Sequence, residues 1–266
     1  MAAEDLARDA AALRKRVDRF VRTELLILPA FSDLLSLSRS FGTAAIFGGL
    51  IRDLALGYAR DFSSDIDVVL KDVPDHVLAR SVSRYGAQRN SFGGFRMQLG
   101  RWMFDLWSYD STWAFAKGFV QPRELTDLLR TTFFNWDAAL FDLQTRELIV
   151  APSYFTDLES RRLAINLRQT PNELGAAVRT LRLMWQSEAE LAPDLAAFLL
   201  AQIQEHGIHQ IVEVDSKRTG RRRLTKDFVG SVAIALQQHQ TERPADPFVL
   251  FDVQRRLPLE ARTGAR

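Results

Sequence analysis

The sequence contains no cysteine and only four histidines. The absence of cysteine excludes disulfides, thiolate metal sites and cysteine nucleophiles, and it fits a reducing compartment. The histidines lack the spacing of metal ligands. His206 and His209 lie on either side of Gly207, so we expect no zinc site there.

Long apolar runs are also missing. No uninterrupted apolar stretch is long enough to span a bilayer. The N-terminal segment carries acidic residues early and lacks an apolar core, so it does not have the pattern of a secretory signal. We therefore expect a cytoplasmic protein without a membrane partner.

Neither sign of charge is in large excess, since 35 lysines and arginines face 33 acidic residues and give a formal charge of +2. This balance argues neither for nor against a nucleic-acid partner, so the distribution of charge must decide. The hydrophobic share of 47% is ordinary for a globular protein. A chain of 266 residues suffices for one large domain or for a head with a smaller appendage.

The most informative stretch covers residues 46–70 and reads IFGGLIRDLALGYARDFSSDIDVVL. A short apolar run ends at Gly48 and Gly49, a helix-like pattern follows, and Asp65 and Asp67 introduce a second apolar run. Residues two apart in a strand point to the same side, so we expect the two carboxylates to lie together. Such a pair is stable mainly where a cation neutralises it, and hard oxygen ligands suit Mg²⁺ that carries a substrate phosphate.

The glycine pair predicts the other half of a phosphate site. Without Cβ atoms, Gly48 and Gly49 let the backbone approach a phosphate closely, and the N–H groups of the helix starting near Leu50 lie behind it. Tight strand-to-helix turns also use glycine for purely steric reasons. The Asp-x-Asp strand that follows favours the phosphate interpretation.

Together these residues resemble the head-domain signature of CCA-adding enzymes and bacterial poly(A) polymerases, which belong to the polymerase-β-type nucleotidyltransferase superfamily. The signature is Gly-Gly-x-Val-Arg-Asp followed by Asp-x-Asp. It is matched here by Gly48, Gly49, Arg52, Asp53, Asp65 and Asp67, with Ile51 in place of valine. The alternative is a glycine-rich turn and two acidic residues at a strand end. The resemblance covers about residues 43–187.

The resemblance implies an α+β fold, in which a head with a mixed, mostly antiparallel sheet is flanked by helices and followed by a helical neck. We expect an N-terminal helical segment packing on the head over residues 1–40, the nucleotidyltransferase head over 41–152, and the neck with a short helical C-terminal part over 153–266. Apolar patterns within the head predict strands at 43–47, 66–70, 88–99 and 102–109 and helices at 50–57 and 74–85.

Asp105 is the third acidic candidate. It lies in a strand of tryptophan, methionine, phenylalanine and leucine, where an unpaired carboxylate is costly. In the resembled family a carboxylate often occupies this place, so the resemblance implies a metal triad of Asp65, Asp67 and Asp105. The alternative is an edge-strand carboxylate that faces water or pairs with Arg101 or Arg96.

Two later segments match the family less closely. The segment from Phe134 to Asp142 resembles the family's Arg-Arg-Asp-Phe-Thr-Ile-Asn-Ala, which helps to hold the nucleotide, but Asp137 replaces asparagine and Arg130 alone remains of the basic pair. The stretch at 163–185 resembles the neck helix. Its nucleotide-binding candidates are Glu173, Arg179 and Arg182. The base-reading Glu-Asp-x-x-Arg is not reproduced, so relaxed or different base selection is expected.

A dense basic run near the C-terminal end is the candidate RNA-binding segment, because lysine and arginine neutralise backbone phosphates. It comprises Lys217, Arg218, Arg221, Arg222, Arg223 and Lys226. The alternative is a solvated loop.

The sequence thus predicts a nucleotidyltransferase that uses two Mg²⁺ ions, with Mn²⁺ as a substitute, and moves an NMP from an NTP to the 3′ end of RNA such as tRNA. Arg52 would neutralise pyrophosphate or instead pair with Asp53 on its helix. Two alternatives stay open. One is the same chemistry on a small molecule or protein hydroxyl, as in defence or toxin systems, and the other is a catalytically idle binding module. A regulatory protein partner is compatible with each.

Overall fold

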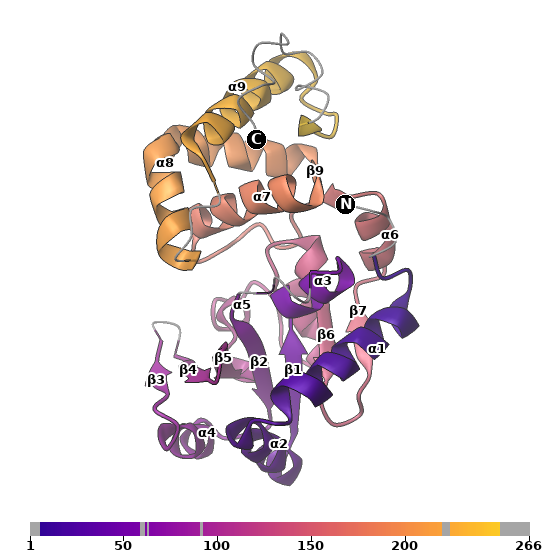
Figure 1. Cartoon of the computed structure of the whole chain (residues 1–266), viewed down its shortest axis with the longest axis vertical. Helices are drawn as coiled ribbons and strands as arrows, with labels where there is room; N and C mark the ends of the chain where they lie inside the picture. Colours follow the sequence, from indigo (N-terminus) through magenta and orange to yellow (C-terminus); the bar gives the residue numbers. More distant parts are fainter. Residues whose placement is uncertain (1–5, 59–61, 63, 91–92, 220–223, 251–266) are drawn as a thin grey trace. The chain divides into compact units, whose positions relative to one another are not determined.

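The structure, a computed structural model, describes residues 6–58, 62, 64–90, 93–219 and 224–250 (Figure 1). The chain divides into two compact units. The head unit comprises Met1–Glu159 and Asn166–Gln169, and the helical unit comprises Ser160–Ile165 and Thr170–Arg266. The N-terminal helices therefore share a unit with the sheet, and the predicted domain limits at residues 40 and 152 stay predictions.

The head unit contains one seven-stranded sheet in the order β3-β4-β5-β2-β1-β6-β7. Its strands are β1 (Thr43–Phe47), β2 (Ile66–Lys71), β3 (Gln88–Arg89), β4 (Phe95–Leu99), β5 (Trp102–Ser108), β6 (Ala139–Asp142) and β7 (Leu148–Val150). β2 and β5 run parallel, whereas the other neighbouring strands of this sheet are antiparallel. The predicted α+β fold with a mixed, mostly antiparallel sheet is confirmed.

Helices cover one face of this sheet. They are α1 (Ala10–Phe20), η2 (Val21–Leu25), α2 (Pro29–Phe41), α3 (Gly49–Ala55) and α4 (Asp75–Ser83). Phe20 of α1 packs on Trp102 with ring centroids 5.3 Å apart, and Phe31 of α2 packs on Phe104 at 5.7 Å. Pro29 occupies the first turn of α2, where a missing N–H costs nothing, and it separates α2 from the helices before it.

The other face carries a second apolar cluster, built around Ala45, Val69 and Leu140. It is covered by short helices, which are η3 (Tyr109–Ser111), α5 (Trp113–Ala116) and η4 (Leu125–Arg130). The further short helices η5 (Asn135–Asp137) and α6 (Tyr154–Glu159) contact each other, and η5 also contacts α3. Because side chains alternate along a strand, the residues next to this cluster on the same face include Asp67 and Asp105. Asp67 and Asp105 thus lie beside the second apolar cluster, on the same face of the sheet.

The prediction of one continuous strand over residues 88–99 is wrong. This segment divides into β3 and β4, which pair with each other in a hairpin. The Asn90 carboxamide oxygen accepts a hydrogen bond from Gly94 N at 3.0 Å. A Cβ on Gly94 would lie 2.7 Å from the Leu106 carbonyl oxygen, so only glycine lets the turn approach β5 this closely.

The helical unit is built from α7 (Glu173–Ser187), α8 (Pro193–Thr219) and α9 (Lys226–Glu242), with a small parallel sheet of β8 (Arg162–Leu163) and β9 (Glu190–Leu191). Asn172 caps α7, because its side-chain oxygen accepts a hydrogen bond from Gly175 N at 2.7 Å. Gly207 interrupts α8 with φ 73°. Within the described ranges, none of the helices combines the length and apolar character needed to cross a membrane.

Candidate active site

The turn between β1 and α3 places the glycine pair at the carboxyl end of β1, an interior strand of the sheet. Gly48 has φ 71° and ψ −123°, a conformation open essentially to glycine alone. Its N–H donates to the Ala139 carbonyl oxygen at 3.0 Å and ties the turn to β6. A Cβ added to Gly49 would meet Arg52 Nη2 at 3.5 Å, which is ordinary contact, so packing within the protein leaves room beside this residue.

Strand register brings the predicted carboxylates to this turn. Asp67 on β2 lies opposite Phe47, the last residue of β1 before Gly48. On its other side, Asp67 is the direct register partner of Asp105 on β5. Partners on adjacent strands point to the same face, so the two carboxylates are neighbours. Asp65, two residues before Asp67, completes the predicted triad at the start of β2.

Arg96 on β4 closes this group of carboxylates. Its Nη2 donates to Asp65 Oδ2 and to Asp105 Oδ2, each at 2.6 Å, and its Nε donates to Asp105 Oδ1 at 2.9 Å. The hydrogen bonds with Asp105 raise the pKa of the guanidinium, burial opposes this, and the negative charges of Asp105, Asp65 and Asp67 raise the pKa further. We call the three carboxylates of Asp65, Asp67 and Asp105 the acidic edge.

These contacts show which of the two arginines considered, Arg96 or Arg101, pairs with Asp105. Arg96 forms the pair, whereas Arg101 pairs with Glu24 at 2.8 Å. Among the described residues, no group of three or more histidine, aspartate or glutamate side chains is arranged to hold a metal ion. The guanidinium lies between the oxygens that such an ion would need. The metal-binding role of Asp65, Asp67 and Asp105 therefore stays a prediction, supported by the chemistry of its donors.

A second arginine, Arg52, lies buried behind the glycine turn. It donates from Nε to Asp53 at 2.8 Å and from Nη1 to Asp137 at 2.5 Å. Burial lowers the pKa of its guanidinium, but the charges of Asp137 and Asp53 more than offset this, so the net pKa is raised. Only 8% of the surface of Arg52 is exposed. Its pair with Asp53 agrees with the alternative role considered for it from the sequence. Nucleotide binding by Arg52, Asp53 or Asp137 stays a prediction.

This buried group explains why the chain has aspartate at 137. A carboxylate there supplies the counter-charge that a buried guanidinium requires, which an asparagine cannot. Tyr154 belongs to the same surroundings, because burial first, and then the charge of Asp137, raise the pKa of its phenol. Arg130 differs, since it lies exposed at the end of η4 and pairs only loosely with Asp127 at 3.7 Å.

The candidates in the helical unit also make contacts within that unit. Glu173 accepts from Gln202 at 3.2 Å. Arg182 bonds the fully buried Asp215 at 2.6 Å, which links α7 to α8. Arg179 lies one turn before Arg182 on α7. The roles of Glu173, Arg179 and Arg182 in nucleotide binding stay predictions.

The basic run is described only in part. Lys217 pairs with Glu213 at 2.6 Å, and Lys226 begins α9. Arg221, Arg222 and Arg223 lie outside the described residues, as does the side chain of Arg218. RNA binding by this run stays a prediction.

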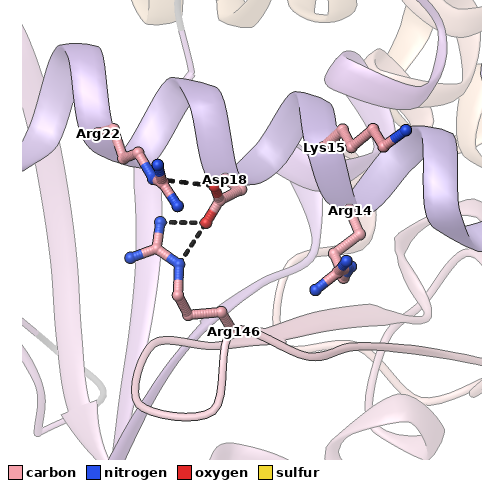
Figure 2. A pocket seen from close by; sticks show the side chains of 5 residues that line it. All are labelled: Arg14, Lys15, Asp18, Arg22 and Arg146. Carbon is pink, nitrogen blue, oxygen red and sulfur yellow. Dashed lines mark hydrogen bonds and ion pairs between the residues drawn. The ribbon is translucent and has the colours of Figure 1, made fainter.

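A basic pocket of about 170 Å³ on the head unit was not predicted (Figure 2). Asp18 lies between Arg22, at 3.0 Å, and Arg146, with Arg14 and Lys15 on the neighbouring part of α1. The sequence shows the basic spacing along α1, but Arg146 comes from the turn between β6 and β7, so no local pattern reveals it.

Comparison with known proteins shows which solved structures have a similar fold. No known family model matches the sequence, and no curated protein matches it either. Among solved structures, the chain is similar to a Thermotoga maritima CCA-adding enzyme complexed with tRNA, with a TM-score of 0.56, 15% identity, and coverage of 88% of this chain and 55% of that one.

A CCA-adding enzyme with CTP gives a TM-score of 0.56 at 16% identity, over 88% of this chain and 56% of that one. A tRNA nucleotidyltransferase with a primer tRNA and an incoming ATP analogue gives 0.52 at 16% identity, over 78% and 61%. The chain thus spans little more than half the length of these structures. At such identities the likeness is one of fold, and at that level the predicted resemblance is confirmed.

Proposed function

We propose that this protein is a metal-dependent nucleotidyltransferase that moves an NMP from an NTP to a hydroxyl at the 3′ end of an RNA such as tRNA. One observation carries the proposal. Asp67 is in register with Asp105 and lies opposite the residue that precedes the Gly48-Gly49 turn. Carboxylates and a backbone that a phosphate can approach closely thus meet where the end of β1 lies beside the start of β2.

The donors of the acidic edge fit hard divalent cations. Carboxylate oxygens are ligands that Mg²⁺ and Mn²⁺ prefer, and Mg²⁺ sites commonly combine one or two carboxylates with substrate phosphates. Asp65 and Asp67 would hold both ions, and Asp105 would hold the one nearer the acceptor. Bound there, a pair of such ions supplies charge stabilisation for the attacking and leaving oxygens of an in-line displacement.

The chain's own residues would position the reactants. The acceptor oxygen forms a bond to the α-phosphorus while the bond to the bridging oxygen of the β-phosphate breaks, pyrophosphate leaves, and the hydroxyl proton passes to solvent. The missing Cβ atoms of Gly48 and Gly49 leave room for the triphosphate. Arg52, held by Asp53 and Asp137, would keep the turn in this conformation.

The likeness of fold supports RNA as the acceptor. Two of the similar structures are complexes with tRNA, and one of them also holds an incoming ATP analogue. The fold spans both units of this chain, since the similarity covers 78–88% of it. A tRNA whose 3′ end is incomplete is therefore the first acceptor to test.

The test measures transfer of label from each α-³²P-labelled NTP, with Mg²⁺, to tRNA transcripts lacking their 3′-terminal nucleotides and to total RNA. We expect labelled RNA with the wild-type protein and none above background with Asp67→Asn. Asp110→Asn is the matched control, because it makes the same change at an exposed residue of η3. Equal labelling by wild type and Asp67→Asn would overturn the proposal.

A further inference from the structure

Arg96 lies where two strands direct opposite charges toward each other. It is the register partner of Asp105 across the hairpin of β4 and β5. Its side chain is 49% exposed, whereas that of Asp105 is 17% exposed. The guanidinium therefore reaches over the acidic edge from the solvent side, on a long side chain that can leave without disturbing the core.

The contacts of Arg96 are those expected of a counter-ion. One nitrogen, Nη2, bonds oxygens from Asp65 and Asp105 at once, each at 2.6 Å. Three neighbouring carboxylates on β2 and β5 repel one another, and the guanidinium offsets part of that repulsion. The group is thus held together by a cation that belongs to the chain.

A divalent ion would need the same place. An Mg²⁺ ion bound by carboxylate oxygens lies about 2.1 Å from them, so an ion shared by Asp65 Oδ2 and Asp105 Oδ2 would approach the position of Nη2. Two cations at that separation repel strongly in a partly buried site. Either the guanidinium or the ion can occupy the space, but not both.

We propose that Arg96 is a built-in counter-cation that closes the acidic edge in the absence of metal and is displaced when a divalent ion binds. The proposal rests on the function proposed above. It assigns to Arg96 a positioning and regulatory role, because metal must compete with the guanidinium and the carboxylates stay assembled until it does.

Mn²⁺ binding provides the first test. Free Mn²⁺ is measured by electron paramagnetic resonance while the full-length protein is titrated. We expect Arg96→Gln to bind Mn²⁺ about tenfold more tightly than the wild type, because the competing ion pair is gone. Arg101→Gln is the matched control: it removes the same charge from the same hairpin, but its side chain pairs with Glu24. We expect its affinity to stay within about twofold of the wild type.

A second measurement follows the guanidinium itself. In ¹H–¹⁵N spectra, the Nε–H of Arg96 should be protected from exchange with water without metal, because it donates to Asp105. On adding Mg²⁺ we expect this protection to disappear. The signal is assigned by its absence in Arg96→Gln, and Arg96→Lys, which keeps the charge without the fork, should bind Mn²⁺ with intermediate affinity.

The outcomes separate this inference from the proposed function. Equal Mn²⁺ affinity in wild type and Arg96→Gln, with binding lost in Asp67→Asn, would overturn the role of Arg96 and leave the metal site intact. An Nε–H that stays protected when Mg²⁺ is bound would also overturn it. Absence of Mn²⁺ binding in every variant would overturn the metal site of the proposed function and the inference with it.

Discussion

Two arginines of the head unit each lie between two aspartates, and they differ in their access to water. Arg52 bonds Asp53 and Asp137 with 10% of its side chain exposed, whereas Arg96 bonds Asp65 and Asp105 with 49% exposed. The same chemistry therefore has two uses. A buried pair cannot be opened without leaving an uncompensated charge, but an exposed one can exchange its partner for another cation.

The difference follows from where the backbone places each group. Arg52 lies on α3, whose N-terminal turn is tied to β6 through Gly48, so its side chain is enclosed by the fold. Arg96 extends from β4, near the edge of the sheet. We infer that the Arg52 cluster fixes the glycine turn, while Arg96 covers the carboxylates that we propose as metal ligands.

The largest effect on stability is expected at the buried cluster. Asp137→Ala should lower the free energy of unfolding by about 3 kcal/mol, because it leaves the Arg52 guanidinium buried with only Asp53 as partner. Urea denaturation, with and without Mg²⁺, measures this, and the loss should be the same in both.

The control for Asp137→Ala is Arg130→Gln, which removes an exposed guanidinium 3.7 Å from Asp127 and should change the free energy of unfolding by less than about 0.5 kcal/mol. Comparable losses in the two variants would show that burial does not distinguish these clusters.

A smaller effect, and one that depends on metal, is expected at the acidic edge. In EDTA, Arg96→Gln should lower the free energy of unfolding by about 1 kcal/mol, because Asp65 and Asp105 lose their ion pairs with the guanidinium. Added Mg²⁺ should raise the melting temperature of this variant more than that of the wild type. A metal-independent loss would mean that Arg96 is a structural residue like Arg52.

The carboxylate of Asp127 differs from those bound to Arg52 and Arg96, because its hydrogen bonds come from backbone N–H groups. The N–H groups of Glu124 and Arg123 donate to it, each at 2.9 Å, and together with Arg130 and Arg123 they lower its pKa below the usual 3.8. Because the folded pKa is depressed, the stabilisation is present above about pH 4 and is lost as the pH falls through the folded value.

Asp127 forms a capping box with Glu124 at the start of η4. Asp127→Ala should therefore lower the free energy of unfolding by about 1 kcal/mol at pH 7, the usual value of a helix cap, and progressively less below pH 4. Urea denaturation at several pH values measures the difference from the wild type. A cost that does not change with pH would rule out a contribution from the charge of Asp127.

Much of the site could be predicted because its signals are local. The glycine pair and the Asp-x-Asp alternation each lie within a few residues, and the structure keeps Gly48 at the turn and Asp67 on the strand. The pairing of Asp105 with Arg96 could also be predicted from the sequence. A two-residue turn at Gly100 and Arg101 fixes the hairpin register, which pairs position 96 with 105.

Other features could not be derived from local patterns because they depend on distant pairing. Asp67 and Asp105 belong to parallel strands, whose register no turn fixes, so the family resemblance implied their proximity but the residues alone did not. Similarly, Asp137 meets Arg52, and Arg146 meets Asp18, across long intervals of sequence. Aspartate replaces the asparagine of the resembled pattern at position 137, and only the contact with Arg52 in the folded structure explains this.

The rate of NMP transfer to tRNA in the single variants Asp67→Asn and Asp105→Asn and in the double variant tests the central claim most directly. If both carboxylates act through the same bound ions, each single change should lower the rate about a thousandfold, and the double change should lower it little further. Wild-type rates in either single variant would contradict the assignment of the acidic edge as a catalytic site.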